Sequence, residues 1–244
     1  MKQSDLRPAR DFVMRYGVKS LCFGAAGTGK TPIADTAPRG ILLAIEPGLN
    51  SMSNSNLPTW CAPSADKIQE FFKWLTESSE AKNFDTVIID SVPEMALQFL
   101  WEGERKHRDG RAAYGHMADA LVGAVDKPGE GLLTKLFYMQ NKHTYLICKQ
   151  ELIEMSSGLG QPVTYRAIPS FPGKVLPVAV PHMYDLIMHL GDKHVPFQLP
   201  PGVTNPVRAF QTKGTNEILA RDRSGQLDGF EFPNLAAIFA KAMR

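Results

Sequence analysis

Short, mostly apolar runs alternate along the chain with longer segments in which apolar residues recur every three or four positions. Short apolar runs are typical of strands buried on both faces, and a spacing of three or four residues is typical of helices. The strand-like runs lie at 20–23, 41–45, 84–90 and 144–148, and the helix-like segments lie at 68–75, 92–104 and 115–140. This alternation predicts an α/β fold, with a mainly parallel sheet flanked by helices.

Local signals refine this pattern in the amino-terminal half. Leu57–Cys61 predicts another short strand, and Ser64 is positioned to cap the helix that follows it. A turn at Pro38–Gly40 limits the helix after the first strand to about two turns.

The last third of the chain has a different composition. Glycine and proline are frequent from Ser156 to Pro181, which predicts a long, partly mobile loop. Strands are expected at 184–190 and 207–212, and the latter is expected to pair with 217–220 as a C-terminal β-hairpin. An amphipathic helix at 235–243 is predicted to close the chain.

Composition and charge narrow the class of protein. With 244 residues, of which 43% are hydrophobic and 21% charged, we expect a polar arm at 1–16 and one domain at 17–244. A formal net charge of +2 excludes an obvious binder of polyanions, so any contact with nucleic acid needs a local basic patch. Three widely spaced cysteines predict buried free thiols, and no apolar stretch approaches the ~18 residues of a membrane span. These features together predict a cytoplasmic protein that makes no use of a membrane.

The residues after the first apolar run form the most informative motif. They read Gly24-Ala25-Ala26-Gly27-Thr28-Gly29-Lys30-Thr31, followed by Pro32 in the first turn of the predicted helix. The glycines let backbone N–H groups turn around phosphate oxygens, the lysine neutralises the β/γ charge, and the threonine hydroxyl binds Mg²⁺. Four fixed positions between a strand and a helix argue against an ordinary Gly-rich turn. This phosphate loop (Gly24–Thr31) predicts binding of a nucleoside triphosphate with Mg²⁺.

One acidic residue is a natural partner for that metal ion. Asp90 ends the apolar run at 84–90, where a carboxylate would face the phosphate loop across the sheet edge. An aspartate at a strand end is often a helix cap, but together with Thr31 it predicts a magnesium site.

Two glutamates compete to orient or deprotonate the attacking water. Ser91 and Glu94 have the S-x-x-E form of a capping box, which gives Glu94 a structural explanation. Glu46 ends the second strand beside Pro47 and gains no cap, while ligands gather at the carboxyl ends of such strands. We therefore favour Glu46 as the general base.

Polar residues also follow the run at 144–148. Lys149, Gln150 and Glu151 are expected at the same sheet edge as the phosphate loop. Lys149 or Gln150 is a candidate to sense the γ-phosphate and to relay its state into the following loop. A solvated strand end is the alternative.

Two basic clusters are candidate contacts for single-stranded nucleic acid, which is held by positive grooves and aromatic platforms. Ordinary solvated surface is the alternative for each. The first is a predicted loop with Arg105, Lys106, Arg108, Arg111 and Tyr114, and the second combines Tyr165, Arg166, Phe171 and Lys174.

Three basic residues near the end of the domain are candidates for a role in a neighbouring subunit. Lys213, Arg221 and Arg223 could reach a neighbour's γ-phosphate as arginine fingers do, or could be surface charges of the hairpin. The six histidines show no spacing typical of a metal site.

Five segments of the chain, which include the phosphate loop and several of the residues discussed above, resemble the phage ATP-binding proteins of the RecA-like class, especially the small single-strand-annealing ATPases. The resemblance implies a RecA-like P-loop NTPase core that hydrolyses ATP with Mg²⁺ and assembles into a ring or filament with ATP between subunits. It also implies a catalytic role for Glu46, a switch position at Lys149 and Gln150, a DNA-facing loop at 156–175, and action in trans by Lys213 or Arg221. The similar segments are FGAAGTGKT (23–31), LLAIEPGL (42–49), FDTVIIDS (84–91), TYLICKQE (144–151) and TKGTNEILARDRSG (212–225).

The leading functional hypothesis is an ATPase that binds single-stranded DNA when assembled and promotes annealing or strand exchange in the host cytoplasm. A small-molecule phosphotransferase with an arginine-bearing lid at 105–114 is a second reading. A nucleotide-gated assembly factor with slow hydrolysis is a third.

Overall fold

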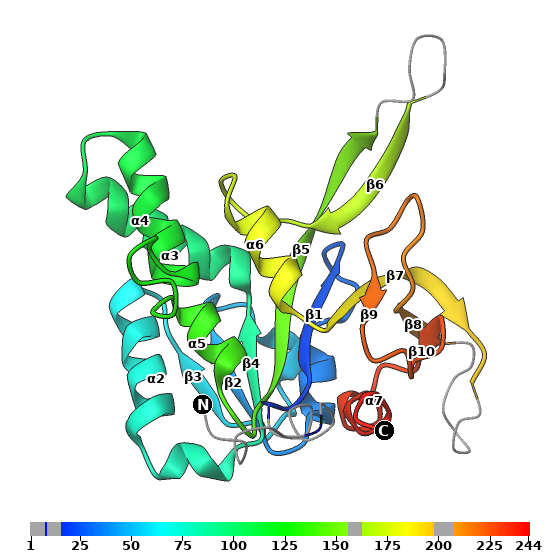
Figure 1. The fold of residues 1–244 in the computed structure, drawn as a ribbon. Coiled ribbons are helices and arrows are strands. Elements are labelled where there is room, and N and C mark those ends of the chain that lie inside the picture. The colour runs from blue at the N-terminus through cyan, green and yellow to red at the C-terminus, as the bar shows by residue number, and fades with distance from the viewer. Residues whose placement is uncertain (1–7, 9–15, 156–162, 198–206) are drawn as a thin grey trace.

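The computed structural model describes residues 8, 16–155, 163–197 and 207–244 and shows a central sheet with helices against both faces (Figure 1). The strands are β1 (Lys19–Gly24), β2 (Gly40–Ala44), β3 (Thr59–Cys61), β4 (Thr86–Asp90), β5 (His143–Met155), β6 (Thr164–Pro169), β7 (Leu186–Val195), β8 (Val207–Gln211), β9 (Arg221–Asp222) and β10 (Phe230–Glu231). The α-helices are α2 (Ala65–Glu77), α3 (Val92–Lys106), α4 (Gly110–Val122), α5 (Leu132–Tyr138), α6 (Leu176–Met183) and α7 (Leu235–Ala242). The 3₁₀ helices are η2 (Pro32–Thr36), η3 (Asn50–Met52) and η4 (Glu80–Asn83).

The strands of the described residues form one mixed sheet in the order β10-β8-β7-β1-β5-β4-β2-β3, with β6 paired to β5 and β9 paired to β7. The six consecutive strands from β7 to β3 are parallel to their neighbours. The β7–β8, β8–β10, β5–β6 and β7–β9 pairs are antiparallel. The predicted α/β sheet, mainly parallel and flanked by helices, is therefore confirmed.

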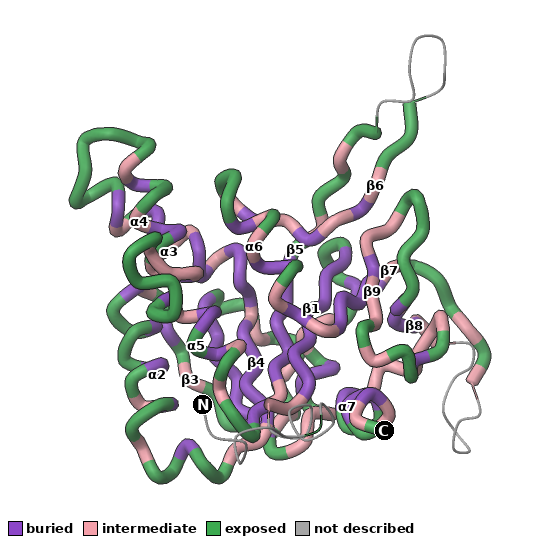
Figure 2. The backbone as a smooth tube through the Cα atoms, in the orientation of Figure 1, coloured by how far each residue is buried: buried purple, intermediate pink, exposed green. Residues whose placement is uncertain are grey.

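Alternate residues of the central strands enter two separate cores. Leu21 and Phe23 pack on the side of α2, α3 and α5, whereas Cys22 packs on the side of η2 and α7. The central strands are buried on both faces, and exposed residues gather on the peripheral helices and on β6 (Figure 2). This double burial explains the continuous apolar runs in the sequence.

Helix α2 shows how local sequence and packing agree. The Ser64 hydroxyl accepts a hydrogen bond from the Lys67 backbone N–H at 3.4 Å, as expected for an N-cap. Ile68, Phe71 and Leu75 recur at helical spacing and are buried against the sheet. Full burial of a side chain of this size stabilises the fold by about 1.5–3 kcal/mol.

The helix predicted over 115–140 is wrong as a single element. Helix α4 starts at Gly110, where Asp109 accepts a hydrogen bond from the Arg111 N–H at 3.0 Å, and it ends at Val122. Gly123 has a φ of 96°, and a Cβ there would lie 2.7 Å from the Pro128 carbonyl oxygen. Only glycine fits this turn, so the chain reverses before α5 begins.

The predicted loop over 156–181 is also wrong for the residues that the structure describes, while 156–162 lie outside them. β5 continues to Met155 and pairs with β6, and Ala167 of β6 forms a parallel bridge to Ile218. The β5–β6 arm projects from the sheet at the top of Figure 1, and α6 follows it. Because both faces of the arm are largely exposed, its sequence lacks the simple alternation of a half-buried strand.

The predicted pairing of 207–212 with 217–220 is wrong. β8 pairs with β7 on one side and with β10 on the other, so the antiparallel C-terminal part of the sheet has different partners from those expected. The segment around Glu217 instead lies beside β6, where the Ala167 N–H donates to the Glu217 carbonyl at 2.7 Å. Turn spacing did not reveal this choice because the segments that join β8 to β7 and to β10 are longer than the short turn between 212 and 217.

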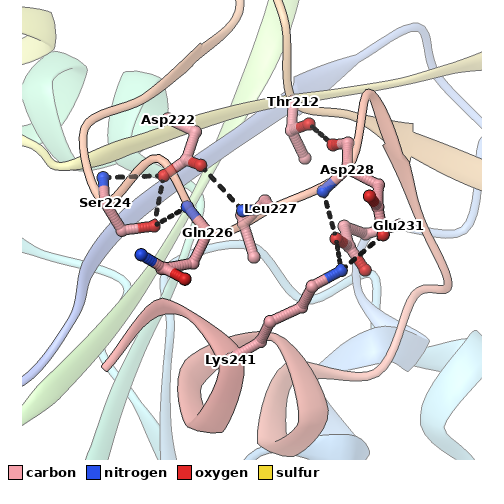
Figure 3. Close-up of polar contacts among 8 residues, drawn as sticks. All are labelled: Thr212, Asp222, Ser224, Gln226, Leu227, Asp228, Glu231 and Lys241. Atoms are coloured by element: carbon pink, nitrogen blue, oxygen red, sulfur yellow. Dashed lines mark hydrogen bonds and ion pairs between the residues drawn. The ribbon is translucent and has the colours of Figure 1, made fainter. Parts of the chain in front are cut away.

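A polar network fixes the segments that close the chain, and Figure 3 shows it around Asp222 and Lys241. One carboxylate oxygen of Asp222 accepts from the Ser224 N–H at 2.8 Å, and the other accepts from the Leu227 N–H at 2.9 Å. Lys241 of α7 donates to Asp228 and to Glu231, each at 2.6 Å. We call this set the C-terminal polar network: Thr212, Asp222, Ser224, Gln226, Leu227, Asp228, Glu231 and Lys241.

Two smaller expectations also need correction. The helix after the phosphate loop is a 3₁₀ helix of five residues, η2, and no α-helix starts there. Cys22 and Cys148 are buried free thiols as predicted, but Cys61 is exposed because β3 is the edge strand of the sheet.

Candidate functional site

The carboxyl ends of the parallel strands bring the predicted site residues to one edge of the sheet. Gly24 of β1 lies opposite Lys149 of β5, and Asp90 of β4 lies opposite Ala44 of β2, two residues before Glu46. Residues more than one hundred positions apart in sequence therefore meet at this edge, as is usual for ligand sites in such sheets.

The backbone of the phosphate loop depends on its glycines. A Cβ at Gly24 would lie 2.2 Å from the Leu190 carbonyl oxygen of β7, so only glycine allows β7 to approach this closely. Gly27 and Gly29 have φ values of 75° and 90°, in the left-handed region that glycine enters without strain. The loop shape thus follows from its own sequence and from the neighbouring strand.

Lys30 turns its ammonium group back onto this loop. Its Nζ donates to the carbonyl oxygens of Gly24 and Ala25, both at 2.8 Å, and to the Thr28 hydroxyl at 3.3 Å. Tyr145, buried under the loop, donates from its hydroxyl to the Lys30 carbonyl at 3.1 Å. Burial lowers the pKa of Lys30, because removal from water disfavours the charged ammonium group.

Thr31 and Asp90 form the contact on which the predicted metal site depends. The Thr31 hydroxyl donates to Asp90 Oδ2 at 2.6 Å, across 59 positions in the sequence. Burial raises the pKa of Asp90, and the nearby charge of Glu46 raises it further, against the opposing effects of Thr31 and Lys30. A hydroxyl and a carboxylate side by side are oxygen ligands of the type Mg²⁺ prefers, so these residues fit that ion.

Glu46 lies next to this pair in a small network of its own. Its Oε1 accepts a hydrogen bond from the Ser91 hydroxyl at 3.0 Å and forms an ion pair with Lys149 Nζ at 3.6 Å. The Glu46 side chain is 44% exposed, so water reaches it freely. Its carboxylate is held in place and open to solvent, which suits a group that orients water.

The capping-box explanation for Glu94 is wrong. The Ser91 side chain makes no cap hydrogen bond and points instead to Glu46. The Glu94 carboxylate is bound by the Lys149 ammonium. Capping therefore gives no reason to prefer Glu46 over Glu94 as the general base. Exposure still favours Glu46, because 44% of its side chain is exposed and only 19% of the Glu94 side chain is.

Lys149 joins the two glutamates. Burial alone would lower the pKa of Lys149, but hydrogen bonding and charge attraction from Glu94 and Glu46 outweigh it and raise the pKa. Gln150, the other candidate sensor, is directed to the opposite side of β1, where its Oε1 lies 3.0 Å from His189 Nε2 on β7. Burial lowers the pKa of His189, which favours the neutral form of its ring.

Sequence reasoning missed one cation beside the phosphate loop. Arg208 of β8 reaches past β7, and its Nη1 donates to the Gly27 carbonyl oxygen at 3.5 Å. Its Nη2 forms an ion pair with Asp192 at 3.2 Å. No spacing in the sequence signals this contact, because β8 and β1 come together only when β7 lies between them.

The first predicted basic cluster lies where α3 meets α4. Arg105 and Lys106 end α3 and Arg111 begins α4, so the compact loop expected over 105–114 is wrong and only 107–109 connect two helices. The four basic side chains of this α3–α4 patch, Arg105, Lys106, Arg108 and Arg111, are exposed. Lys106 is paired with Glu102 at 2.5 Å.

The second cluster does not form one surface loop. Arg166 lies on β6 of the arm, Phe171 is buried in the core, and Lys174 precedes α6. Tyr165 is 54% exposed on β6, whereas the next residue, Arg166, is half-buried and points to the other face of the strand. The DNA-facing loop implied for 156–175 lies partly outside the described residues, at 156–162.

The three basic residues considered for a neighbouring subunit lie apart from the phosphate loop. Arg221 donates to the carbonyls of Pro181 and Tyr184, and Arg223 donates to that of His182 at 2.7 Å. β9 pairs with Leu186 and Ile187 of β7, whereas the loop lies against Leu190. These contacts give both arginines structural roles in their own chain, whereas Lys213 is exposed.

We call the residues gathered at the loop the carboxyl-edge cluster: Lys30, Thr31, Glu46, Asp90, Ser91, Glu94 and Lys149. Within the part of the chain that is described, no group of three or more His, Cys, Asp or Glu side chains is arranged to hold a metal ion. Metal binding at the cluster would therefore rely on Thr31, Asp90 and the phosphates of a ligand. No helix among the described residues is long and apolar enough to cross a membrane.

The chain matches a family model and is similar to a solved protein structure. A family model described as an AAA domain matches residues 17–224. Among solved structures, a KaiC-like protein from the hyperthermophilic archaeon Pyrococcus horikoshii is similar over 80% of this chain and 85% of its own, with 14% identity and a TM-score of 0.40. No match was found among curated proteins. The mainly parallel sheet flanked by helices that the sequence predicts is observed here, with β5 between the phosphate-loop strand β1 and the Asp90 strand β4.

Proposed function

Because the chain belongs to the AAA domain family, whose P-loop NTPase members bind nucleotides, we propose that it hydrolyses ATP with Mg²⁺ at the phosphate loop. The observation that carries the proposal is the contact of Thr31 with Asp90 at 2.6 Å beside the loop lysine. Thr31 and Asp90 then supply two oxygen ligands for a metal ion, and Lys30 supplies a positive charge, all at one phosphate loop. Phosphoryl transfer depends on such groups to neutralise and align the phosphates.

In this proposal the phosphate loop binds the phosphates through its backbone. N–H groups of 24–31 surround the phosphate chain, and Lys30 exchanges the carbonyls of Gly24 and Ala25 for phosphate oxygens. Thr31 and Asp90 would hold Mg²⁺, which when bound supplies neutralisation of phosphate charge and alignment of the oxygens. Placing full positive charge near Asp90 also removes the penalty that burial imposes on its carboxylate.

Glu46 is the proposed general base. Its exposed carboxylate accepts a proton from the attacking water, while the Ser91 hydroxyl and Lys149 fix its position. Glu94 is the weaker candidate because its carboxylate is less exposed and already bound to Lys149.

The proposal is tested by comparing two matched variants, Glu46→Gln and Glu94→Gln. Glu46→Gln is expected to bind Mg·ATP with unchanged affinity while turnover falls by about 100-fold or more, since general-base catalysis contributes on the order of 10²–10⁴. Glu94→Gln is expected to keep most of its turnover. Turnover lost only in Glu94→Gln would reverse the assignment, and no binding of Mg·ATP by the wild-type protein would reject the function.

We also propose that Lys149 and Gln150 report the nucleotide state to the β5–β6 arm. Both residues lie on β5, which runs without a break from the phosphate loop into the arm. A change in the partners of Lys149 would therefore act directly on the base of the arm.

Single-stranded DNA is the proposed partner. The α3–α4 patch carries four exposed basic residues with Trp101 and Tyr114 exposed beside them on the same helices. The arm adds exposed Tyr165 and, on the other face of β6, half-buried Arg166, and Lys174 is exposed before α6. Basic groups interleaved with aromatic rings are typical of surfaces that hold a single strand, where bases stack on the rings. On this proposal the protein promotes annealing or strand exchange in its assembled state.

This partner is tested by neutralising Arg105, Lys106, Arg108 and Arg111 together. The variant is expected to lose affinity for single-stranded DNA and the stimulation of ATP turnover by DNA, and the salt dependence of binding should become shallower. A matched variant without the exposed lysines Lys67, Lys73 and Lys82 of α2 and η4 serves as the control. Unchanged binding would exclude the patch, and stimulation of turnover by a small acceptor but not by DNA would favour a phosphotransferase.

Assembly into a ring or filament with ATP between subunits is part of the same proposal and is supported by the resemblance in sequence. Among the candidates for action in trans, Lys213 has an exposed side chain, whereas Arg221 is bound to carbonyls of its own chain. Size analysis with a non-hydrolysable ATP analogue tests assembly, and a monomer under all conditions would reject it.

A further inference from the structure

Arg208 has a position that no structural requirement of its own strand explains. Its guanidinium extends from β8 past β7 to the phosphate loop, where the long 3.5 Å contact with the Gly27 carbonyl is its only hydrogen bond to the loop among the described residues. Its Asp192 partner has a side chain that is 91% exposed, and such ion pairs in water contribute little to stability. Neither partner accounts for a cation held at this place.

The guanidinium is also incompletely satisfied. Its Nε is buried and makes no hydrogen bond to any residue that the structure describes. Buried donors in native proteins nearly always have a partner, so a buried donor without one calls for an explanation. A guanidinium beside a phosphate-binding turn is suited to donate hydrogen bonds to a phosphate oxygen, which would be the missing partner.

The order of strands shows which part of a nucleotide would meet Arg208. Thr31, Asp90 and Glu46 belong to the β5–β4–β2 side of the loop, whereas Arg208 comes from the β7–β8 side. If the terminal phosphate lies at the Thr31–Asp90 contact, Arg208 lies beside the phosphates nearer the ribose. A group in this position contacts ATP and ADP alike.

We infer that Arg208 is a nucleotide-binding residue that contacts a non-terminal phosphate of ATP and ADP bound in the phosphate loop of its own chain. This inference rests on the proposed function of the loop. Without nucleotide, the ion pair with Asp192 holds the Arg208 guanidinium beside Gly27, and a phosphate would replace Asp192 as its partner. Asp192 lies in the irregular part of β7, between Leu190 and His194. The role is one of affinity, because Arg208 lies away from the groups proposed to act on water.

The experiment compares wild-type protein with Arg208→Gln and Arg208→Lys in equilibrium binding of Mg·ATP and ADP. Arg39→Gln is the matched control, since Arg39 is also paired with an aspartate, Asp85, but lies before β2 at the opposite edge of the sheet. Arg208→Gln is expected to weaken ATP and ADP by a similar factor of about 10 or more, as for loss of a charge-assisted hydrogen bond. Arg208→Lys should lose less affinity for both nucleotides, and Arg39→Gln should bind them as the wild type does.

Wild-type affinity for ADP in Arg208→Gln would overturn the inference and leave the proposed function standing. Loss of ATP affinity with unchanged ADP affinity would overturn it as well, because Arg208 would then act on the terminal phosphate. If Arg208→Gln fails to fold, Arg208→Lys decides the matter, since weaker ADP binding with an unchanged unfolding temperature supports the inference and unchanged binding overturns it. Failure of the wild-type protein to bind either nucleotide overturns both.

Discussion

The carboxyl-edge cluster and the C-terminal polar network both join charged side chains to neighbouring backbone, yet they are satisfied in different ways. In the C-terminal polar network each carboxylate has donors from its own segment or from Lys241, so the contacts are complete within the chain (Figure 3). In the carboxyl-edge cluster Lys30 binds only neutral oxygens, and Asp90 has a hydroxyl as its hydrogen-bond donor. The first arrangement is typical of structure, and the second is typical of a site that awaits charge from a ligand.

The pKa shifts of two aspartates express the same contrast. A hydrogen bond and the charge of Lys241 lower the pKa of Asp228, so its carboxylate is favoured by folding. Burial raises the pKa of Asp90, so its carboxylate is disfavoured by folding. A cation at Asp90 would reverse that effect, whereas Asp228 already has its cation.

The largest expected effect is that of Asp90→Asn on turnover. Removal of the proposed metal ligand should lower ATP turnover by about 100-fold or more, while the amide oxygen still accepts from Thr31. The free energy of unfolding without nucleotide should change by less than about 1 kcal/mol or rise, because a buried carboxylate is lost. Steady-state kinetics and denaturant unfolding measure the two quantities.

Asp228→Asn is the control for that variant, and its turnover should equal that of the wild type. A loss of stability in Asp90→Asn as large as that of a core truncation, with turnover retained, would show that the carboxyl-edge cluster is structural like the C-terminal polar network.

A smaller effect is expected from Lys241→Met in the C-terminal polar network. This change removes the donor to Asp228 and Glu231. It should lower the midpoint of thermal unfolding by about 1–3 °C, because the pair with Asp228 is largely exposed and contributes little. Nucleotide affinity should not change. Weaker nucleotide binding in Lys241→Met would mean that the two regions are coupled and that the contrast between them is wrong.

The smallest effect concerns pH. Since the pKa of Asp90 is raised, Mg·ATP affinity should increase as pH rises through that raised value, and Asp90→Asn should remove this increase. The pKa of Asp228 is lowered, so the stability from its pair with Lys241 is present above the ordinary value of 3.8 and is lost as pH falls through the lower folded value. Nucleotide titrations across pH measure the change in Mg·ATP affinity, and unfolding curves across pH measure the change in stability. The two changes should occur in different pH ranges.

The strands and the phosphate loop were predictable because their signals are local or repeat at a fixed period. Apolar runs gave β1, β2, β4 and the first half of β5, and the loop pattern placed Lys30 and Thr31 next to each other. The position of Asp90 beside Thr31 followed from one further rule, that parallel strands end at a common edge.

Other features were not predictable because they depend on which distant segment supplies a partner. Gly123 looked like one more residue of a helix until the Pro128 carbonyl filled the space that a Cβ would need. Ser91 and Glu94 matched a capping box, but Glu46 and Lys149 competed for the same two side chains and bound them. A local sequence pattern cannot reveal such competition, because the competing residues are distant in the sequence.

The sequence by itself determined the alternating strands and helices, the phosphate loop, and the carboxylates at the ends of β2 and β4, because each is written in neighbouring residues. Tertiary structure alone decided the extension of β5 into an arm, the pairing of β8 with β7 and β10, and the approach of Arg208 to Gly27. These outcomes depend on contacts between residues far apart in the chain, whose energies are settled only when the whole sheet is assembled.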